Sequence, residues 1–130
     1  KKNLKKNPKI AVTGLNPHCE SILRFNEDDK IVYNAINSQK KRGVNVSGPF
    51  PADTIFLKKN RKQFNVILGM YHDQVLTPIK TIFEFNAINI TMGLPFLRVT
   101  PDHGPNKNMV GKNISNPISL INALTFLDRN

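Results

Sequence analysis

The sequence predicts an α/β fold with a largely parallel sheet and flanking helices. Short apolar runs typical of strands alternate with segments that carry helix signals, and no internal repeat is present. The chain has 130 residues, of which 39% are hydrophobic, and this content is compatible with a core that excludes water. We therefore expect one modest globular unit built from alternating strands and helices.

The first strand and the first helix have chemically marked ends. Residues 9–13 form an apolar run that is closed by Gly14. Asn26 can cap a helix that begins at Glu27 and ends near Lys40, because its side-chain oxygen can accept a hydrogen bond from an N–H group of the first turn. The expected apolar side of this helix consists of Ile31, Ala35 and Ile36.

Two further strands are expected at residues 44–46 and 64–70. Between them, residues 48–51 read Gly-Pro-Phe-Pro and predict a stiff turn that places Asp53 where it could cap a short helix. The run at 64–70 is continuously apolar, which is typical of a buried parallel strand. His72 follows at the carboxyl end of this strand, where side chains line the ligand crevices of open α/β sheets.

The remaining chain is expected to contain a helix, two strands and a last helix. The helix covers about residues 76–85, and the strands cover 87–92 and 97–100. Asn116 is predicted to cap the last helix, with Pro117 at its first position.

The charge is strongly basic, with a formal net charge of +10 from 19 Lys and Arg against 9 Asp and Glu. The basic residues gather at 1–9 and 58–62, without interleaved aromatic residues that could stack on bases, so nucleic-acid binding is ranked last. The single Cys19 cannot form an internal disulfide, and neither a signal peptide nor an apolar run of about 20 residues is present. We expect a cytoplasmic protein without a membrane partner. The chain starts at Lys1 instead of Met, which suggests a truncated product.

Three histidines, at positions 18, 72 and 103, stand beside loop-forming residues. Local zinc motifs place their ligands two to five residues apart, so these three would have to converge through the fold. The spacing leaves two interpretations open, a metal site and ordinary surface imidazoles.

Five short words in the sequence closely resemble, in their order, the second half of the 4-hydroxythreonine-4-phosphate dehydrogenase family. The words are Gly14–His18, Gly48–Thr54, Met70–Gln74, Asn89–Pro95 and Asp102–Gly104. The resemblance implies a truncated fold of the isocitrate/isopropylmalate dehydrogenase type that lacks its N-terminal half. It also implies that residues 1–87 belong to the interdomain and dimer-forming part, and residues 88–130 to the cofactor-binding part.

In that family, three histidines from both subunits of a homodimer hold a divalent metal such as Zn, Mg or Co. Two of them match His18 and His72, and the third would lie upstream of Lys1. Because useful metal affinity needs three or four ligands, the isolated piece is expected to bind metal poorly and to be inactive. Asp53 and Asp73 match carboxylates near the metal that could orient ligands or accept a proton. The alternatives are a helix cap for Asp53 and a hydrogen-bond acceptor for Asp73.

Three positions match substrate-binding residues of the family, namely Lys80, Asn89 and Arg98. Their chemistry suits a phosphorylated amino acid, since Arg offers a bidentate fork and Lys a point charge to an anion. Without the resemblance, Lys80 would be interpreted as a solvated helix residue.

The segment from residue 102 to residue 117 is similar to the cofactor loop of the wider fold, which binds NAD or NADP without the Gly-rich Rossmann fingerprint. The cofactor positions implied are His103, Gly104, Gly111 and Asn116. A plain connection before the last helix would equally explain the glycines.

The resemblance implies NAD(P)- and metal-dependent oxidation and decarboxylation of 4-phosphohydroxy-L-threonine to 3-amino-2-oxopropyl phosphate, in pyridoxal 5'-phosphate biosynthesis. One alternative is a related dehydrogenase of threonate or erythronate 4-phosphate, and another is an inactive folding or dimerisation module. The chain departs from the family pattern at Cys19-Glu20, Val75 and Pro105-Asn106, while the ligand and substrate positions are kept.

Overall fold

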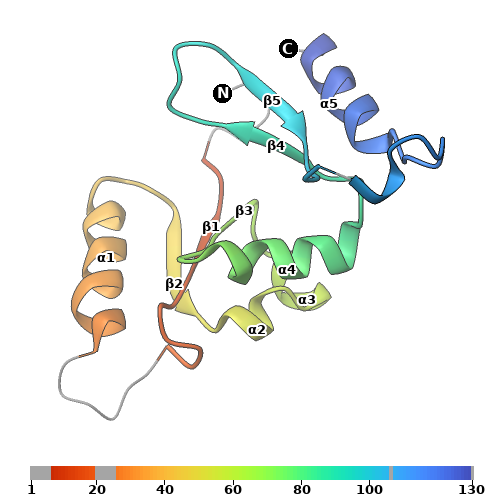
Figure 1. The fold of residues 1–130 in the computed structure, drawn as a ribbon. Helices are drawn as coiled ribbons and strands as arrows, with labels where there is room; N and C mark the ends of the chain where they lie inside the picture. The colour runs from red at the N-terminus through yellow and green to blue at the C-terminus, as the bar shows by residue number, and fades with distance from the viewer. Residues whose placement is uncertain (1–6, 20–25, 106, 130) are drawn as a thin grey trace. The chain divides into compact units, whose positions relative to one another are not determined.

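The computed structural model describes residues 7–19, 26–105 and 107–129, so Glu20, Asn106 and most of the N-terminal lysines lie outside the described residues. The chain divides into two compact units, Lys1–Pro78 and Ile79–Asn130 (Figure 1). The division falls inside helix α4 (His72–Phe83), earlier than the predicted boundary after residue 87. The assignment of the two stretches to a dimer-forming and a cofactor-binding part stays a prediction.

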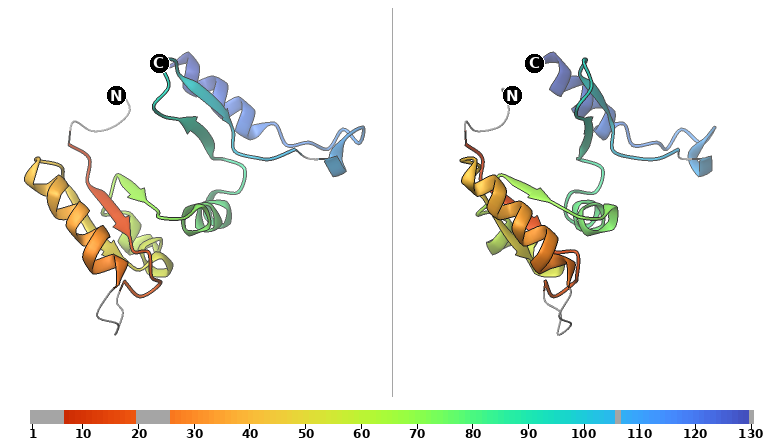
Figure 2. Two further views of the ribbon diagram at one scale, coloured as in Figure 1. Left: turned by 60° about the vertical axis from the view of Figure 1, so that its left-hand side comes forward. Right: turned by 90° about the vertical axis from the view of Figure 1, so that its left-hand side faces the viewer.

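The first unit contains a parallel sheet of three strands. These are β1 (Ile10–Thr13), β2 (Val46–Phe50) and β3 (Val66–Leu68), in the order β2-β1-β3 (Figures 1 and 2). Both neighbours pair with β1 in parallel, and Ile10 lies opposite Val46 on one side and Val66 on the other. The predicted α/β class and the parallel sheet are therefore confirmed.

One helical segment, η1 (Asp28–Val32) followed by α1 (Tyr33–Lys41), covers this sheet. Asn26 caps it as predicted, because its Oδ1 accepts a hydrogen bond of 2.7 Å from the Asp29 N–H. The side chains that enter the core are Val32 and Ile36, which pack with Val12 and Val46. Ile36 was expected there.

The other two residues predicted for the apolar side, Ile31 and Ala35, are exposed in the described chain. Ile31 and Ala35 nevertheless lie on the apolar side, because they line one apolar hollow together with Val32 and Ile36. They stay exposed because no described segment covers this hollow.

The second strand, β2, begins at Val46, where the strand predicted at 44–46 was expected to end. Most of the turn predicted at 48–51 therefore belongs to β2. β2 runs through Gly48 and Pro49 to Phe50, with an irregular register against β1. Gly48 has φ +133°, and a Cβ atom there would lie 2.4 Å from the Val12 carbonyl oxygen. Only glycine allows this close approach of two strands. The sequence pattern was interpreted as a turn because Gly and Pro are also typical turn residues.

Two short helices follow, α2 (Ala52–Ile55) and α3 (Lys58–Arg61). Asp53 does not cap α2, so that prediction is wrong. The N-cap position belongs to the extended Pro51, without a side-chain hydrogen bond, and Asp53 lies exposed in the first turn. The helix begins two residues earlier than the cap interpretation requires.

The third strand is shorter and more exposed than its apolar run predicted. β3 contains three residues at the edge of the described sheet, and Leu68 is 52% exposed. Helix α4 then begins at His72, four residues earlier than expected, and includes Pro78 in its interior. His72 and Asp73 therefore stand in the first turn of a helix instead of in a loop.

The second unit contains an antiparallel pair of strands, a short 3-10 turn and a helix. These are β4 (Ile88–Thr91), β5 (Arg98–Pro101), η2 (Lys107–Met109) and α5 (Ile118–Asp128). The strands match their predicted positions, but they form a hairpin separate from the parallel sheet. Asn116 Oδ1 accepts a 3.0 Å hydrogen bond from the Ile118 N–H, but the N-cap position belongs to Pro117 and the helix begins at Ile118, one residue later than predicted. Among the described helices, none has both the length and the apolar character needed to cross a membrane.

Candidate active site

The first group of candidate residues follows the carboxyl ends of β1 and β3. Because these strands are adjacent and parallel, their carboxyl ends lie at the same edge of the sheet. The segment after β1 carries His18, and the first turn of α4 after β3 carries His72. The topology therefore brings the two predicted metal ligands to one edge.

Gln74 joins these two strand ends. Its Oε1 accepts hydrogen bonds from Thr13 Oγ1 at 2.7 Å and from the Met70 N–H at 2.8 Å, and its Nε2 donates to the Gly14 carbonyl at 2.8 Å. The side chain thus connects the end of β1, the end of β3 and the start of α4. Sequence reasoning did not select Gln74, although it stands in the His72-Asp73-Gln74 word.

Asp28 holds the loop that leads to His18. Its carboxylate accepts backbone N–H bonds from Leu15 at 2.6 Å and from Asn16 at 2.7 Å, and the residue is only 1% exposed. Asn16 Oδ1 in turn accepts a 3.0 Å bond from the His18 N–H. Sequence reasoning did not select Asp28, because no local pattern indicates a partner 13 residues earlier.

The histidines themselves are turned to the surface. His18 is exposed, and His72 pairs its Nδ1 with Asp73 Oδ1 at 2.7 Å while both side chains are more than three-quarters exposed. Imidazole and carboxylate groups have suitable chemistry for a divalent metal. Within the described residues, however, no three His, Cys, Asp or Glu side chains are grouped to hold a metal ion. The described part of this chain alone therefore does not supply a complete donor set.

The second group of candidate residues lies on the β4–β5 hairpin. The register pairs Asn89 with Thr100 and Thr91 with Arg98, so these four polar residues share one face. The other face carries Ile88, Ile90, Val99 and Pro101. Arg98 Nη1 donates a 2.8 Å hydrogen bond to Thr91 Oγ1. Two of the three predicted substrate-binding residues, Asn89 and Arg98, are thus brought to one face, which we call the polar hairpin face.

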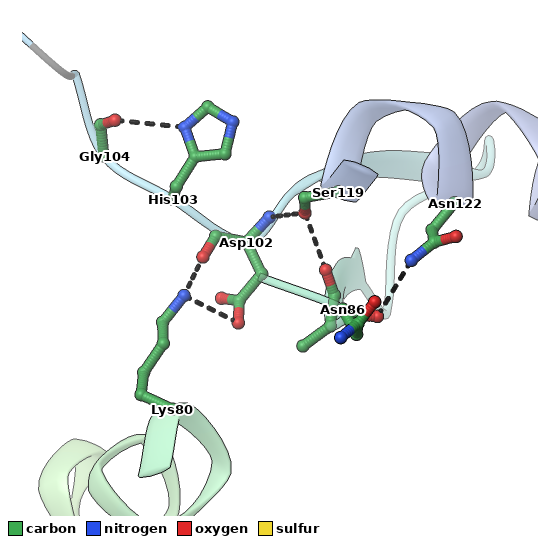
Figure 3. Close-up of polar contacts among 8 residues, drawn as sticks. Lys80, Asn86, Asp102, His103, Gly104, Ser119 and Asn122 are labelled. Atoms are coloured by element: carbon green, nitrogen blue, oxygen red, sulfur yellow. Dashed lines mark hydrogen bonds and ion pairs between the residues drawn. The ribbon is translucent and has the colours of Figure 1, made fainter. Parts of the chain in front are cut away.

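Lys80, the third predicted substrate residue, is bound to the start of the next connection (Figure 3). Its Nζ lies 2.9 Å from Asp102 Oδ2 and also donates to the Asp102 carbonyl oxygen. The Asp102 N–H donates to Ser119 Oγ at 2.8 Å, and the Ser119 hydroxyl donates to the Ala87 carbonyl at 2.6 Å. Lys80 is thus a partly exposed helix residue, as the alternative interpretation expects, but its ammonium is also paired with Asp102. Sequence reasoning missed both Asp102 and Ser119 as members of this site.

The predicted cofactor residues are spread along the connection before α5. His103 Nδ1 lies 3.1 Å from the Gly104 carbonyl oxygen, Gly111 has φ +75°, and Asn116 accepts a hydrogen bond from the first residue of α5. Each of these observations describes a local structural role. The binding of NAD or NADP by these residues stays a prediction.

The fold and the candidate residues together define an α/β protein with polar groups at strand ends, as in enzymes of small molecules. Residues 1–127 match the family described as pyridoxal phosphate biosynthetic protein PdxA, and the chain belongs to this family. The resemblance seen in the five sequence words is thereby confirmed.

Named relatives agree with this assignment. The chain is 43% identical over 123 residues to the 4-hydroxythreonine-4-phosphate dehydrogenase of Xanthobacter autotrophicus, covering 94% of this chain and 35% of that protein. It is 41% identical to a protein of Oceanobacillus iheyensis provisionally named D-threonate 4-phosphate dehydrogenase, covering 92% of this chain and 36% of that protein. The crystal structure of the Klebsiella pneumoniae 4-hydroxythreonine-4-phosphate dehydrogenase is similar with a TM-score of 0.76 and 34% identity, over 94% of this chain and 37% of that one. The chain thus spans only about 35% of the length of the relatives it matches.

Proposed function

We propose that the protein carrying this chain oxidises and decarboxylates 4-phosphohydroxy-L-threonine to 3-amino-2-oxopropyl phosphate in pyridoxal 5'-phosphate biosynthesis, with NAD or NADP as hydride acceptor. The observation that carries this proposal is the family match over residues 1–127, together with relatives named as dehydrogenases. We propose a cytoplasmic homodimer that acts on a small anionic substrate and binds neither nucleic acid nor membrane.

The polar hairpin face and Lys80 would bind the substrate. Arg98 can offer a bidentate fork to a phosphate or a carboxylate, and Lys80 a single positive charge. Asn89, on the same face as Arg98, can donate to and accept from the substrate's neutral groups. A phosphorylated amino acid has the combination of groups that such a set recognises.

His18 and His72 would contribute to a divalent metal site (Zn, Mg or Co), with further ligands from outside this chain. Such a metal, when bound, would polarise the substrate hydroxyl. Asp73 accepts the Nδ1 proton of His72 at 2.7 Å in one tautomer, which leaves Nε2 with its lone pair available as a ligand. Asp73 is therefore proposed to orient His72, whereas the exposed Asp53 would be the proton acceptor.

A second candidate is the oxidation of a phosphorylated sugar acid such as threonate or erythronate 4-phosphate. The Oceanobacillus iheyensis relative, at 41% identity, favours it. Those substrates carry a hydroxyl where 4-phosphohydroxy-threonine carries an amino group, and Lys80, Asn89 and Arg98 suit both. A third candidate is an inactive folding or dimerisation module.

The test is NADH and NADPH formation by the full-length gene product with each phosphorylated substrate and a divalent metal. His18→Ala and His72→Ala are each expected to lower kcat/KM by at least about 100-fold, the usual cost of disturbing a metal's ligand set. Lys58→Ala, an exposed residue of α3, is the control and should leave activity unchanged. Turnover of threonate phosphate alone would transfer the assignment to the second candidate, and no turnover of any substrate would favour the third.

A further inference from the structure

Asp102 is a largely buried acid whose carboxylate is paired with the Lys80 ammonium. The side chain is 14% exposed, its Oδ2 is buried, and Lys80 Nζ lies 2.9 Å away. A carboxylate removed from water needs such a partner, since burying an unpaired charge is strongly unfavourable. The pair Lys80–Asp102 is therefore coupled through the carboxylate and also through the Asp102 carbonyl, to which Lys80 donates.

The two members of this pair differ in how firmly they are held. The Asp102 backbone is fixed by Ser119, a fully buried residue of α5, which is itself bonded to the Ala87 carbonyl just before β4. Figure 3 shows Ser119 and Lys80 reaching Asp102 from opposite sides. Lys80, by contrast, is 39% exposed and has a flexible four-carbon stem. Asp102 is therefore anchored through its backbone N–H, whereas the flexible Lys80 side chain is held in place through Asp102.

The position of Asp102 along the strand connects this pair with the polar hairpin face. Thr100 lies on that face opposite Asn89, and Asp102 follows two residues later, just past the end of β5. Asp102 directly follows the strand that carries Arg98, and its ion pair therefore ties the Lys80 ammonium to the carboxyl end of β5.

We propose that Asp102 is the positioning residue for Lys80, which it holds ready for the anionic group of the substrate. This inference rests on the proposed function, because it assigns the task of the Lys80–Asp102 pair within that site. Two effects oppose each other at Asp102: its negative charge repels an anion, whereas its hold on Lys80 removes the need to order a long side chain on binding. The preorganising effect dominates, because Lys80 still presents its charge while its freedom is already restricted.

The first measurement needs no substrate and no variant. The wild-type full-length protein is treated with an amine-acylating reagent at low salt, and the modification rate of each lysine is read by peptide mass spectrometry. Lys80 should react several-fold more slowly than Lys58 and Lys59, which are exposed, and added salt should raise its rate. Equal rates for the three lysines would overturn the proposal.

The second measurement compares Asp102→Asn with Asp128→Asn, which removes the same charge from an exposed site on α5. In Asp102→Asn, Lys80 acylation should accelerate and inorganic phosphate should protect Lys80 less well. KM for the phosphorylated substrate should rise about tenfold with kcat changed less than about threefold, because one long side chain must now be ordered on binding. A lower KM would show that Asp102 merely competes with the anion. If the wild type oxidises neither substrate, the proposed function fails, while the acylation rates still decide whether Asp102 positions Lys80.

Discussion

The two groups of candidate residues are held in place in different ways. In the first unit, the predicted metal ligands His18 and His72 are exposed, and the buried Asp28 and the partly buried Gln74 hold the backbone around them. In the second unit, Asn89 and Arg98 share a strand face by register, and Lys80 is fixed by an ion pair. This chain therefore preorganises the backbone of the first group and the side chains of the second. The backbone at both histidines is therefore held in place, and the proposed metal site would need ligands from outside the described residues.

The largest effect in this comparison is expected from Asp28→Ala. The substitution leaves the Leu15 and Asn16 N–H groups without their acceptor and removes two charge-assisted hydrogen bonds. We expect a loss of about 3 kcal/mol in the free energy of unfolding. Both lost bonds lie near the start of the segment that carries His18, so this segment should be the part most affected. Urea unfolding followed by circular dichroism measures the loss.

The control for Asp28→Ala is Glu27→Gln, which removes an exposed acid at the start of the same helical segment. This control should change the free energy of unfolding by less than about 0.5 kcal/mol. Equal effects of the two variants would mean that the loop does not depend on the Asp28 carboxylate, and the first half of the comparison would fail.

A smaller effect is expected from Gln74→Ala. It removes the acceptor of Thr13 Oγ1 and the Met70 N–H and the donor to the Gly14 carbonyl, at a partly buried site. We expect a loss of about 2 kcal/mol, and faster amide hydrogen exchange at the Met70 N–H that loses its acceptor. Gln63→Ala, at an exposed position two residues after the end of α3, is the matched control. Unchanged exchange at Met70 in Gln74→Ala would contradict the role given to this side chain.

The parts of the fold that the sequence predicts correctly depend on local chemistry. The strand at 9–13 is an apolar run closed by a glycine, and the Asn26 and Asn116 side chains accept hydrogen bonds from N–H groups two or three residues away. β2 was misplaced because its passage through Gly48 depends on a close approach to Val12, 36 residues earlier. The exposure of β3 was missed because an apolar run cannot tell whether a neighbouring strand is present.

The candidate site divides in the same way. The sequence predicts the candidate residues at strand ends, such as His18 and His72. It does not predict the side chains that hold them in position. Gln74 reaches Gly14 across 60 residues, and Asp102 meets Lys80 across 22. Contacts of this kind depend on strand order and register, which local patterns do not specify.

The smallest effect, and the sharpest test of the difference between the two units, is expected from Ser119→Ala. Ser119 is fully buried, and its loss leaves the Asp102 N–H and the Ala87 carbonyl without this partner. Because both lost bonds are between neutral groups, we expect a loss of about 1–2 kcal/mol, seen as faster amide hydrogen exchange of the β5 and α5 segments. Thr125→Ala, which removes an exposed hydroxyl bonded within α5, should have little effect. If amide hydrogen exchange in residues 10–13 of β1 rises as much as in β5, the two units unfold together as a single cooperative unit. The contrast between backbone and side-chain preorganisation would then not hold.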